Sequence, residues 1–402
     1  MTDRLYYENA YLMEFDAQVL ACRPNGNHFD VLLDRSAFYP TSGGQPYDTG
    51  TLGGAQVVDV NVADGDVWHT VDQAIGVGET VHGRIDWERR FDHMQQHAGD
   101  HMIAGTIHRM LGGVTIGLHI SEHVSTIDVS MPDGATRISE ENVRRIELEV
   151  NEQIQRDVPI RCWFPSEEEL ALLPLRKKPT VSEHIRIVAI GDREMVACGG
   201  THPSSAGQIG LVKIVSVTPA RGKMRVAFVA GRRALMHYFT CFDAAHSTAA
   251  LVSSSVDRLP SAVSALQEKL RTAEFELVSL KKNQLLSQTQ KMLDKAETLA
   301  DGTKLVTGFV DADAMLLKEF VSKLIEQPGV IALMGASNGE QKLYVFGRSE
   351  DVDANMGTLL RDAARPLGGK GGGRPDFAQG GGCEAILEAA CSEIRRQKQG
   401  NV

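Results

Sequence analysis

The sequence has little of several features that would assign it to a class at once. Its 402 residues contain six cysteines, which are scattered rather than spaced as a disulfide framework. Reduced thiols and a cytoplasmic location are therefore expected. No run of about 18 apolar residues is present, so we expect no membrane-spanning helix. The N-terminus lacks the basic start and apolar stretch of a secretory signal.

An excess of positive charge is also missing. Lysine and arginine number 42 against 52 aspartate and glutamate residues, which gives a net charge of −10. The chain as a whole has no electrostatic preference for nucleic acid, so local basic patches must hold any polyanionic partner. The length allows roughly two to four domains with at least one sizeable hydrophobic core.

Residues 1–88 are expected to form a small N-terminal β-barrel-like domain. Apolar residues alternate with polar ones on both sides of a Pro-Asn-Gly turn at 24–26, and again around Asp64 and Gly65. Such alternation is typical of strands with one buried face, and both short sequences favour turns. Short strands at this spacing are typical of a small barrel or sandwich.

Residues 89–240 are expected to form a mixed α+β domain. Apolar residues at helical spacing, from Phe91 through Met102 to Leu111, predict one helix. Ser139 precedes two acidic residues and an amphipathic run, so it is the expected N-cap of a second helix. The stretch from 180 to 235 is mostly strand-like in its pattern.

Residues 241–300 are expected to form a helical or coiled-coil linker. Apolar residues there alternate spacings of four and three, which is the signature of a heptad seam. The pattern leaves two structures open, a dimeric coiled coil and a long helix that packs within its own chain. The seam consists of Leu259, Val263, Leu266, Leu270, Ala273, Leu277 and Leu280.

Residues 301–402 are expected to form a small C-terminal α/β domain. "KLVTGFV", "VIALMGAS" and "KLYVFGRS" read as strands, and "MLLKEFVSKLIEQ" reads as a helix. A glycine-rich segment follows at 368–382. The expected fold class is therefore α+β, with a small N-terminal β-barrel, a mixed α/β domain, a helical segment and a small α/β domain.

Two pairs of side chains have the spacing of metal ligands. His97 and His101 are four residues apart in the first predicted helix, so their imidazoles lie on one face. "CGGTH" places Cys198 and His202 around two glycines, which favour a tight turn. Three imidazoles and a thiolate suit Zn²⁺. Each residue also has an ordinary explanation, because a cysteine can be a small core residue and a histidine can bond to backbone.

Five short motifs surround and include these two pairs. They are "FYPTSGGQPYDTG" at 38–50, "GRIDWERRFDHMQQHAGDH" at 83–101, "GLHISEHVSTIDV" at 117–129, "CGGTH" at 198–202 and "GKMRVAFVAGRRA" at 222–234. In this order they resemble the motifs of alanyl-tRNA editing domains. The later glycine-rich segment resembles the DHH-associated domain that ends alanyl-tRNA synthetases. Together they make the chain similar to the free-standing alanyl-tRNA editing proteins (AlaX) in their long form.

The resemblance implies a zinc-dependent aminoacyl-tRNA deacylase that hydrolyses mischarged Ser-tRNA(Ala) or Gly-tRNA(Ala). It implies that one Zn²⁺ is bound by His97, His101, Cys198 and His202, and that residues 89–240 are the editing domain. The chain departs from the family pattern at three positions. Ser42 replaces the first glycine of a usual triple. Ala98 is at a position where the family often has Ser or Thr, and Asp100 is at one where Glu, Gln or Thr is usual.

The glycine-rich motif at 38–50 supplies the expected substrate-binding or catalytic residues. Thr41 is the candidate reader of the serine hydroxyl, with bonding to its own turn as the alternative. Gly43 and Gly44 allow close backbone approach, and their N–H groups with Gln45 are expected to hold the ester oxygen or the ribose. If all four metal ligands bind tightly, the zinc anchors substrate or fold rather than activating water.

The C-terminal glycine run carries the expected tRNA-binding residues, Arg361, Arg365, Lys370 and Arg374. The alternative there is a flexible loop with solvated charges. A different function class also fits, namely a non-catalytic tRNA-binding or oligomerisation protein with a structural zinc. A DHH phosphoesterase is disfavoured because no Asp-His-His run occurs, and a zinc peptidase because no H-E-x-x-H occurs.

Overall fold

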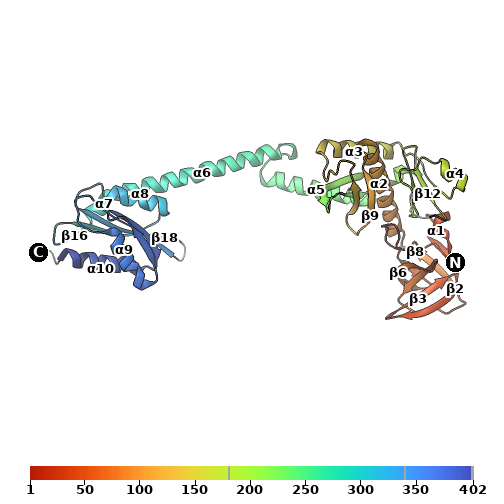
Figure 1. Ribbon diagram of the computed structural model, residues 1–402, viewed down its shortest axis with the longest axis horizontal. Helices are drawn as coiled ribbons and strands as arrows, with labels where there is room; N and C mark the ends of the chain where they lie inside the picture. The colour runs from red at the N-terminus through yellow and green to blue at the C-terminus, as the bar shows by residue number, and fades with distance from the viewer. Residues whose placement is uncertain (180–181, 339–340, 400–402) are drawn as a thin grey trace. The chain divides into compact units, whose positions relative to one another are not determined.

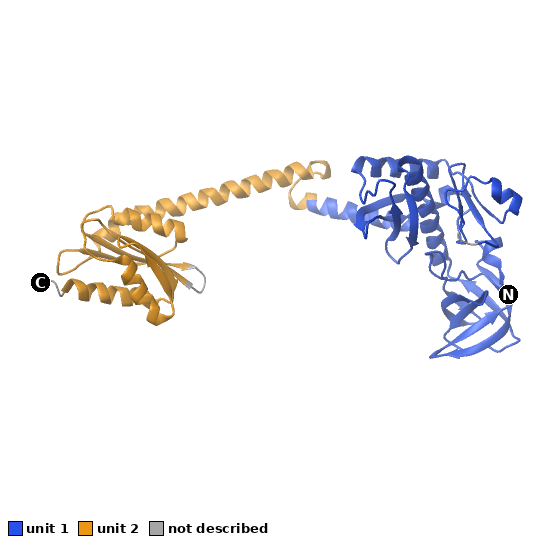
Figure 2. Cartoon of the chain, in the orientation of Figure 1, with its two compact units in different colours: residues 1–248 blue, residues 249–402 orange. Residues whose placement is uncertain are grey.

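The computed structural model describes residues 1–179, 182–338 and 341–399. The chain divides into two compact units, residues 1–248 and 249–402 (Figure 2). Both units combine helices with strands, as the sequence predicts, whereas the finer division into four segments stays a prediction. Among the described residues, none of the helices combines the length and apolar character that crossing a bilayer requires.

Strands close to the N-terminus form a closed barrel in the order β2-β3-β7-β6-β5-β8 (Figure 1). Burial alternates along β2 and β8, because successive side chains of a strand point to opposite faces. The predicted turns lie between β2 and β3 and between β6 and β7, with Gly26 and Gly65 at positive φ. The elements are β1 (Asp3–Arg4), α1 (Leu5–Glu8), β2 (Glu14–Asn25), β3 (His28–Leu33), β4 (Arg35–Ser36), β5 (Gly50–Leu52), β6 (Ala55–Ala63), β7 (Asp66–Val71) and β8 (Thr80–Ile85).

The long helix α2 (Trp87–Leu111) runs through the interior of the first unit. Asp86 caps it by accepting from the backbone N–H of Arg89 at 3.2 Å, and Gly112 ends it with φ of 71°. Every residue from 93 to 107 is buried, so the helix packs on all sides. This confirms the predicted helix and explains why its histidines lie away from solvent.

Two antiparallel sheets surround α2, in the orders β14-β15-β10-β9 and β11-β12-β13. Helix α3 packs on α2, and Ser139 accepts from the backbone N–H of Asn142, which confirms the predicted cap. The elements are β9 (Val114–His119), β10 (Ser125–Ser130), α3 (Glu140–Gln155), β11 (Ile160–Trp163), α4 (Glu167–Leu172), β12 (Ile187–Ile190), β13 (Glu194–Ala197), η1 (Ala206–Ile209), β14 (Val212–Ala220), β15 (Lys223–Ala230) and α5 (Gly231–Leu251).

Helix α6 (Leu259–Ser287) forms much of the predicted heptad segment in the second unit. It ends at Ser287, before residue 300, and the next positions of the heptad seam, Gln284 and Ser287, are polar. Leu285 and Leu293 are instead buried in the core of the C-terminal domain. The apolar seam further up the helix is exposed.

The C-terminal part of the second unit is a sheet in the order β16-β17-β18-β19-β21-β20. The strands and helix predicted between 304 and 348 are confirmed. Strands β20 and β21 were not predicted, because glycine has low strand propensity. The elements are η2 (Val256–Arg258), α7 (Thr289–Asp294), β16 (Glu297–Thr298), β17 (Lys304–Val310), α8 (Ala314–Leu324), β18 (Val330–Asn338), β19 (Gln341–Arg348), α9 (Met356–Ala364), η3 (Arg365–Leu367), β20 (Lys370–Gly373), β21 (Phe377–Gly382) and α10 (Ala385–Gln399).

The glycine run is thus a β-hairpin rather than a flexible loop. A Cβ on Gly371 would lie 2.7 Å from Cγ of Leu360 on α9, and a Cβ on Gly357 would lie 2.5 Å from the carbonyl oxygen of Gly373. Helix α9 therefore packs directly against strand backbone, which only glycine permits. The strands are rich in glycine because they pack closely against α9, and this same glycine content is why the sequence did not predict them as strands.

Candidate metal centre

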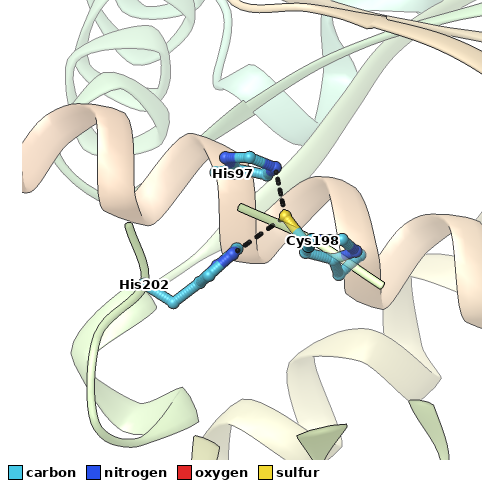
Figure 3. A group of neighbouring side chains, drawn as sticks. His97, Cys198 and His202 are labelled. Carbon is cyan, nitrogen blue, oxygen red and sulfur yellow. Dashed lines mark hydrogen bonds between the residues drawn. The ribbon is translucent and has the colours of Figure 1, made fainter. Parts of the chain in front are cut away.

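The two predicted ligand pairs meet in the first unit. His97 and His101 lie one turn apart on α2, and Cys198 and His202 lie on the turn after β13. One ligand atom from each residue lies within 4.8 Å of those of the other three. Figure 3 shows the sulfur of Cys198 between Nε2 of His97, at 3.3 Å, and Nε2 of His202, at 3.4 Å.

The donor set fits a metal ion. In a tetrahedral zinc site, bond lengths of about 2.0–2.3 Å place ligand atoms about 3.4–3.6 Å apart, close to the sulfur–nitrogen distances here. Both ring nitrogens of His101 and Nδ1 of His202 are buried without a hydrogen-bond partner in the described structure. Buried nitrogens without partners are costly, and an ion bound among these side chains would supply one.

The electrostatics of the cluster favour neutral imidazoles. Burial, together with nearby Arg186, lowers the pKa of His97 to about 3, and it lowers the pKa of His101 and His202 well below the usual value. Burial raises the pKa of the Cys198 thiol to about 12. The imidazoles are therefore free to donate lone pairs at neutral pH, whereas the thiol needs a nearby cation to ionise.

The "CGGTH" turn is held in place by a buried arginine. Nη1 of Arg186 donates to the carbonyl oxygens of Gly200 and Cys198, at 2.8 and 3.2 Å. A Cβ on Gly200 would overlap with the ring of His97, so this position requires glycine for close approach. Sequence analysis missed Arg186, because no local motif marks an arginine that satisfies the carbonyls of a distant turn.

Gln45 connects the glycine-rich motif to the cluster. Its Oε1 accepts from Nδ1 of His97 at 2.8 Å, and its Nε2 donates to Oγ1 of Thr201 at 2.8 Å. Metal-binding histidines commonly donate their second ring N–H in this way, which leaves Nε2 for the metal. Gln45 is fully buried. Its amide thus already bonds to His97 and Thr201, and a contact of Gln45 with the ester oxygen or ribose stays a prediction.

The rest of the motif forms a tight turn against the sheet. Ser42 and Gln45 exchange backbone hydrogen bonds at 2.9 and 3.1 Å, with Gly43 and Gly44 at positive φ between them. The carbonyl of Gly44 accepts from the N–H of Ile120 at 2.9 Å, which joins this turn to the end of β9. Thr41 is exposed beside the turn. Both glycines are therefore needed for conformation, whatever they bind.

Asp48, later in the same motif, is structural. It is fully buried and accepts from Nε of Arg90 on α2 at 2.9 Å and from the N–H of Tyr39 at 2.6 Å. A buried carboxylate is stable only when paired and hydrogen-bonded in this way. The pair anchors the motif on the helix that carries His97, and it ties the barrel to the metal centre.

The four predicted tRNA-binding residues belong to the second unit. Arg361 belongs to α9, Arg365 to η3 and Lys370 to β20, and Arg374 follows β20. All four side chains are exposed. Arg374 pairs with Asp376 at 3.2 Å. Lys370 and Arg374 lie at opposite ends of β20, and no ligand defines the role of the four cations.

Three sequence families match parts of the chain. Residues 3–89 match the class II (A) tRNA synthetases, residues 185–226 match the second additional domain of threonyl and alanyl tRNA synthetases, and residues 302–399 match the DHHA1 domain. The C-Ala domain of the Aquifex aeolicus alanyl-tRNA synthetase covers 26% of this chain at 24% identity, with a TM-score of 0.24, which is too low to bear on the fold.

Curated relatives cover nearly the whole chain. Alanyl-tRNA editing protein AlaX-L from Pyrococcus horikoshii is 30% identical over 427 residues, covering 99% of this chain and all of that protein. An alanine–tRNA ligase from Halorubrum lacusprofundi is 31% identical over 410 residues, and another from Methanothrix thermoacetophila is 32% identical over 422. The chain spans only 44% and 45% of the length of these two ligases.

The metal-ligand cluster and the glycine-rich turn define a class of protein, the domains that edit alanyl-tRNA. The relative that the chain matches over its full length is an alanyl-tRNA editing protein. The chain belongs to the family of alanyl-tRNA editing proteins, in the long AlaX form.

Proposed function

We propose that this chain is a trans-editing deacylase that hydrolyses the ester bond between tRNA(Ala) and a wrongly attached serine or glycine. The observation that carries the proposal is the four-residue cluster at 97, 101, 198 and 202, bonded through Gln45 to the glycine-rich turn. Full-length similarity to an alanyl-tRNA editing protein supports the reaction class. Such an activity belongs with the tRNA pool of the cytoplasm.

The ion in this proposal is one Zn²⁺ per chain. Three imidazoles with one thiolate are borderline-soft ligands, which favour zinc over magnesium or calcium. A bound zinc ion supplies Lewis acidity toward the ester carbonyl or a water of lowered pKa. The protein holds the ligands in place, since Gln45 orients His97 and Arg186 fixes the turn that carries the other pair.

Thr41 is the proposed reader of the serine hydroxyl. Its side chain is exposed, and it lies four positions before Gln45, which touches a metal ligand. An aminoacylation pocket shaped for alanine cannot strongly reject an added hydroxyl. A site that hydrogen-bonds that hydroxyl instead discriminates against alanine by a factor of about 10⁴–10⁵. Gly43 is an exposed residue where a Cβ would meet no atom within 4 Å, and its backbone N–H is the proposed contact for the ester end.

The second unit is proposed to add affinity for the tRNA. Arg361, Arg365, Lys370 and Arg374 are exposed around one hairpin in a chain of net charge −10. Exposed cations of this kind bind phosphates without reading sequence. The DHHA1 match covers all four positions.

A parallel homodimer through α6 is also proposed. Its seam residues Leu266, Leu270 and Leu277 are 56%, 60% and 55% exposed, which is costly for a solitary helix. In the heptad register that places Leu270 at a and Leu266 at d, Lys269 is at g and Glu274 at the next e. Opposite charges at these positions pair between parallel chains. Glu276 and Lys281 repeat the pattern one heptad later.

The proposed function is tested by incubating the full chain with Ser-tRNA(Ala), Gly-tRNA(Ala) and Ala-tRNA(Ala) and following release of the amino acid. Rapid hydrolysis of the serine or glycine ester, with Ala-tRNA(Ala) spared, is the expected result. Stable binding of all three tRNAs without hydrolysis would instead favour a non-catalytic tRNA-binding protein with a structural zinc.

A further inference from the structure

Glu194, at the start of β13, is a buried carboxylate beside one of the metal-ligand candidates. It is 5% exposed, and its Oε1 lies 4.0 Å from Nδ1 of His101. The same oxygen accepts from Nε of Arg176 at 2.8 Å. His97, one turn earlier on α2, already has Gln45 at its Nδ1. Each α2 histidine therefore has a different acceptor facing the same ring nitrogen.

Gly105 makes room for this carboxylate. It follows His101 by four residues on α2, so both lie on one face of the helix. A Cβ at position 105 would overlap with Oε2 of Glu194. Glycine inside a helix costs about 0.5–1 kcal/mol relative to alanine. The space it leaves is occupied by the Glu194 carboxylate, which an alanine would displace from His101.

We propose that Glu194 is a positioning residue that accepts a hydrogen bond from Nδ1–H of His101 and thereby presents Nε2 of that ring to the zinc ion. The proposal rests on the proposed function only in requiring that the cluster binds zinc. Carboxylates commonly hold metal-binding histidines in this way and fix their tautomer. The 4.0 Å separation exceeds a hydrogen bond by about 1 Å, so the proposal requires the two side chains to move closer when the ion is bound.

The surrounding charges allow Glu194 to act as an acceptor. Arg176, with its side chain 8% exposed, pairs with Glu194 and also donates to Oγ1 of Thr115 at 3.1 Å. Asp100 is a second buried carboxylate, and burial raises its pKa to about 7, with Arg176 lowering that pKa and Glu194 raising it. A purely structural explanation for Glu194 therefore exists, namely that it only neutralises Arg176. The two explanations predict different zinc affinities when Glu194 is replaced.

The test measures zinc affinity of the full chain by competition with a chromogenic chelator, together with the visible spectrum of the cobalt-substituted protein. Glu194→Leu removes the acceptor and is expected to weaken zinc binding by 10- to 100-fold. Glu194→Gln keeps an acceptor oxygen and is expected to recover part of that loss. Gly105→Ala retains Glu194 but displaces it, so it is expected to weaken zinc binding and to change the cobalt spectrum.

Glu149→Gln is the matched control. Glu149 also pairs with arginines, at 2.6 Å to Arg109 and 3.1 Å to Arg193, but it touches no metal-ligand candidate. Its zinc affinity is expected to equal that of the unchanged chain. If Gly105→Ala and Glu194→Leu both bind zinc as tightly as the control, Glu194 is only the partner of Arg176 and the proposal is wrong. Deacylation is not measured here, so a failure of the proposed function would leave this result standing.

Discussion

Replacing Gly200 by alanine is the sharpest perturbation of the metal centre. The new Cβ would overlap with Cε1 and Nδ1 of His97, and it would lie 3.0 Å from Oε1 of Gln45. The imidazole would have to retreat by about 1 Å to regain ordinary contact, whereas zinc–ligand distances tolerate about 0.2 Å. The retreat would also stretch the 2.8 Å bond between Gln45 and His97.

The expected effect of Gly200→Ala is a loss of zinc affinity of about 100-fold, which corresponds to about 2.8 kcal/mol. Deacylation should fall in parallel at limiting zinc. The backbone itself should tolerate the change, because Gly200 lies outside the left-handed region. Zinc affinity from chelator competition, with zinc content after dialysis, is the assay.

Gly199→Ala is the matched control for this prediction. The two glycines are adjacent, and neither has a positive φ. A Cβ at position 199 would meet only the hydroxyl of Tyr7, at 3.3 Å. Gly199→Ala should therefore keep its zinc and gain up to about 1 kcal/mol of stability from the restricted unfolded chain. Equal zinc affinity in the two variants would refute the close packing of the turn on His97.

Three further predictions concern other parts of the chain. Burial holds the pKa of His69 at about 4, below its usual 6.5, so the stability that the neutral imidazole contributes is present above pH 6.5 and is lost as the pH falls to 4. The free energy of unfolding should therefore drop by roughly 3 kcal/mol across that window, and it should drop by less in the His69→Gln variant. Lys269→Glu should weaken dimerisation a few-fold in sedimentation equilibrium, and adding Glu274→Lys should restore it, whereas no change would exclude the parallel register. Changing Arg365 and Lys370 to glutamine should raise the Kd for tRNA and flatten its salt dependence, with kcat unchanged; an unaltered Kd would remove the second unit from tRNA binding.

The sequence was most informative where the spacing of nearby residues decides whether their side chains lie on the same side of a helix or turn. Four-residue spacing places His97 and His101 on one helix face, and two glycines allow Cys198 and His202 to share a turn. These four residues do come together. The helix that carries the first pair was also predicted, because its apolar residues recur at helical spacing; the structure adds its ends, at Asp86 and Gly112.

The remainder depends on contacts between distant residues. Gln45 lies 52 positions before His97, and its role as hydrogen-bond partner follows from how the barrel docks on α2. Arg186 donates to the carbonyls of the "CGGTH" turn, and Glu194 accepts from Arg176, and only the folded chain brings these groups together. The glycine hairpin gave no strand signal, because its glycines are required by the packing of α9 rather than by strand propensity.

The most direct test of the central claim is the zinc dependence of deacylation. The full chain would be stripped of metal with a chelator, and its hydrolysis of Ser-tRNA(Ala) measured before and after one equivalent of Zn²⁺ is returned, alongside a Cys198→Ala variant. The account predicts that activity disappears on stripping, returns with zinc in the unchanged chain, and does not return in the variant. Full activity in the stripped protein, or in Cys198→Ala, would contradict it.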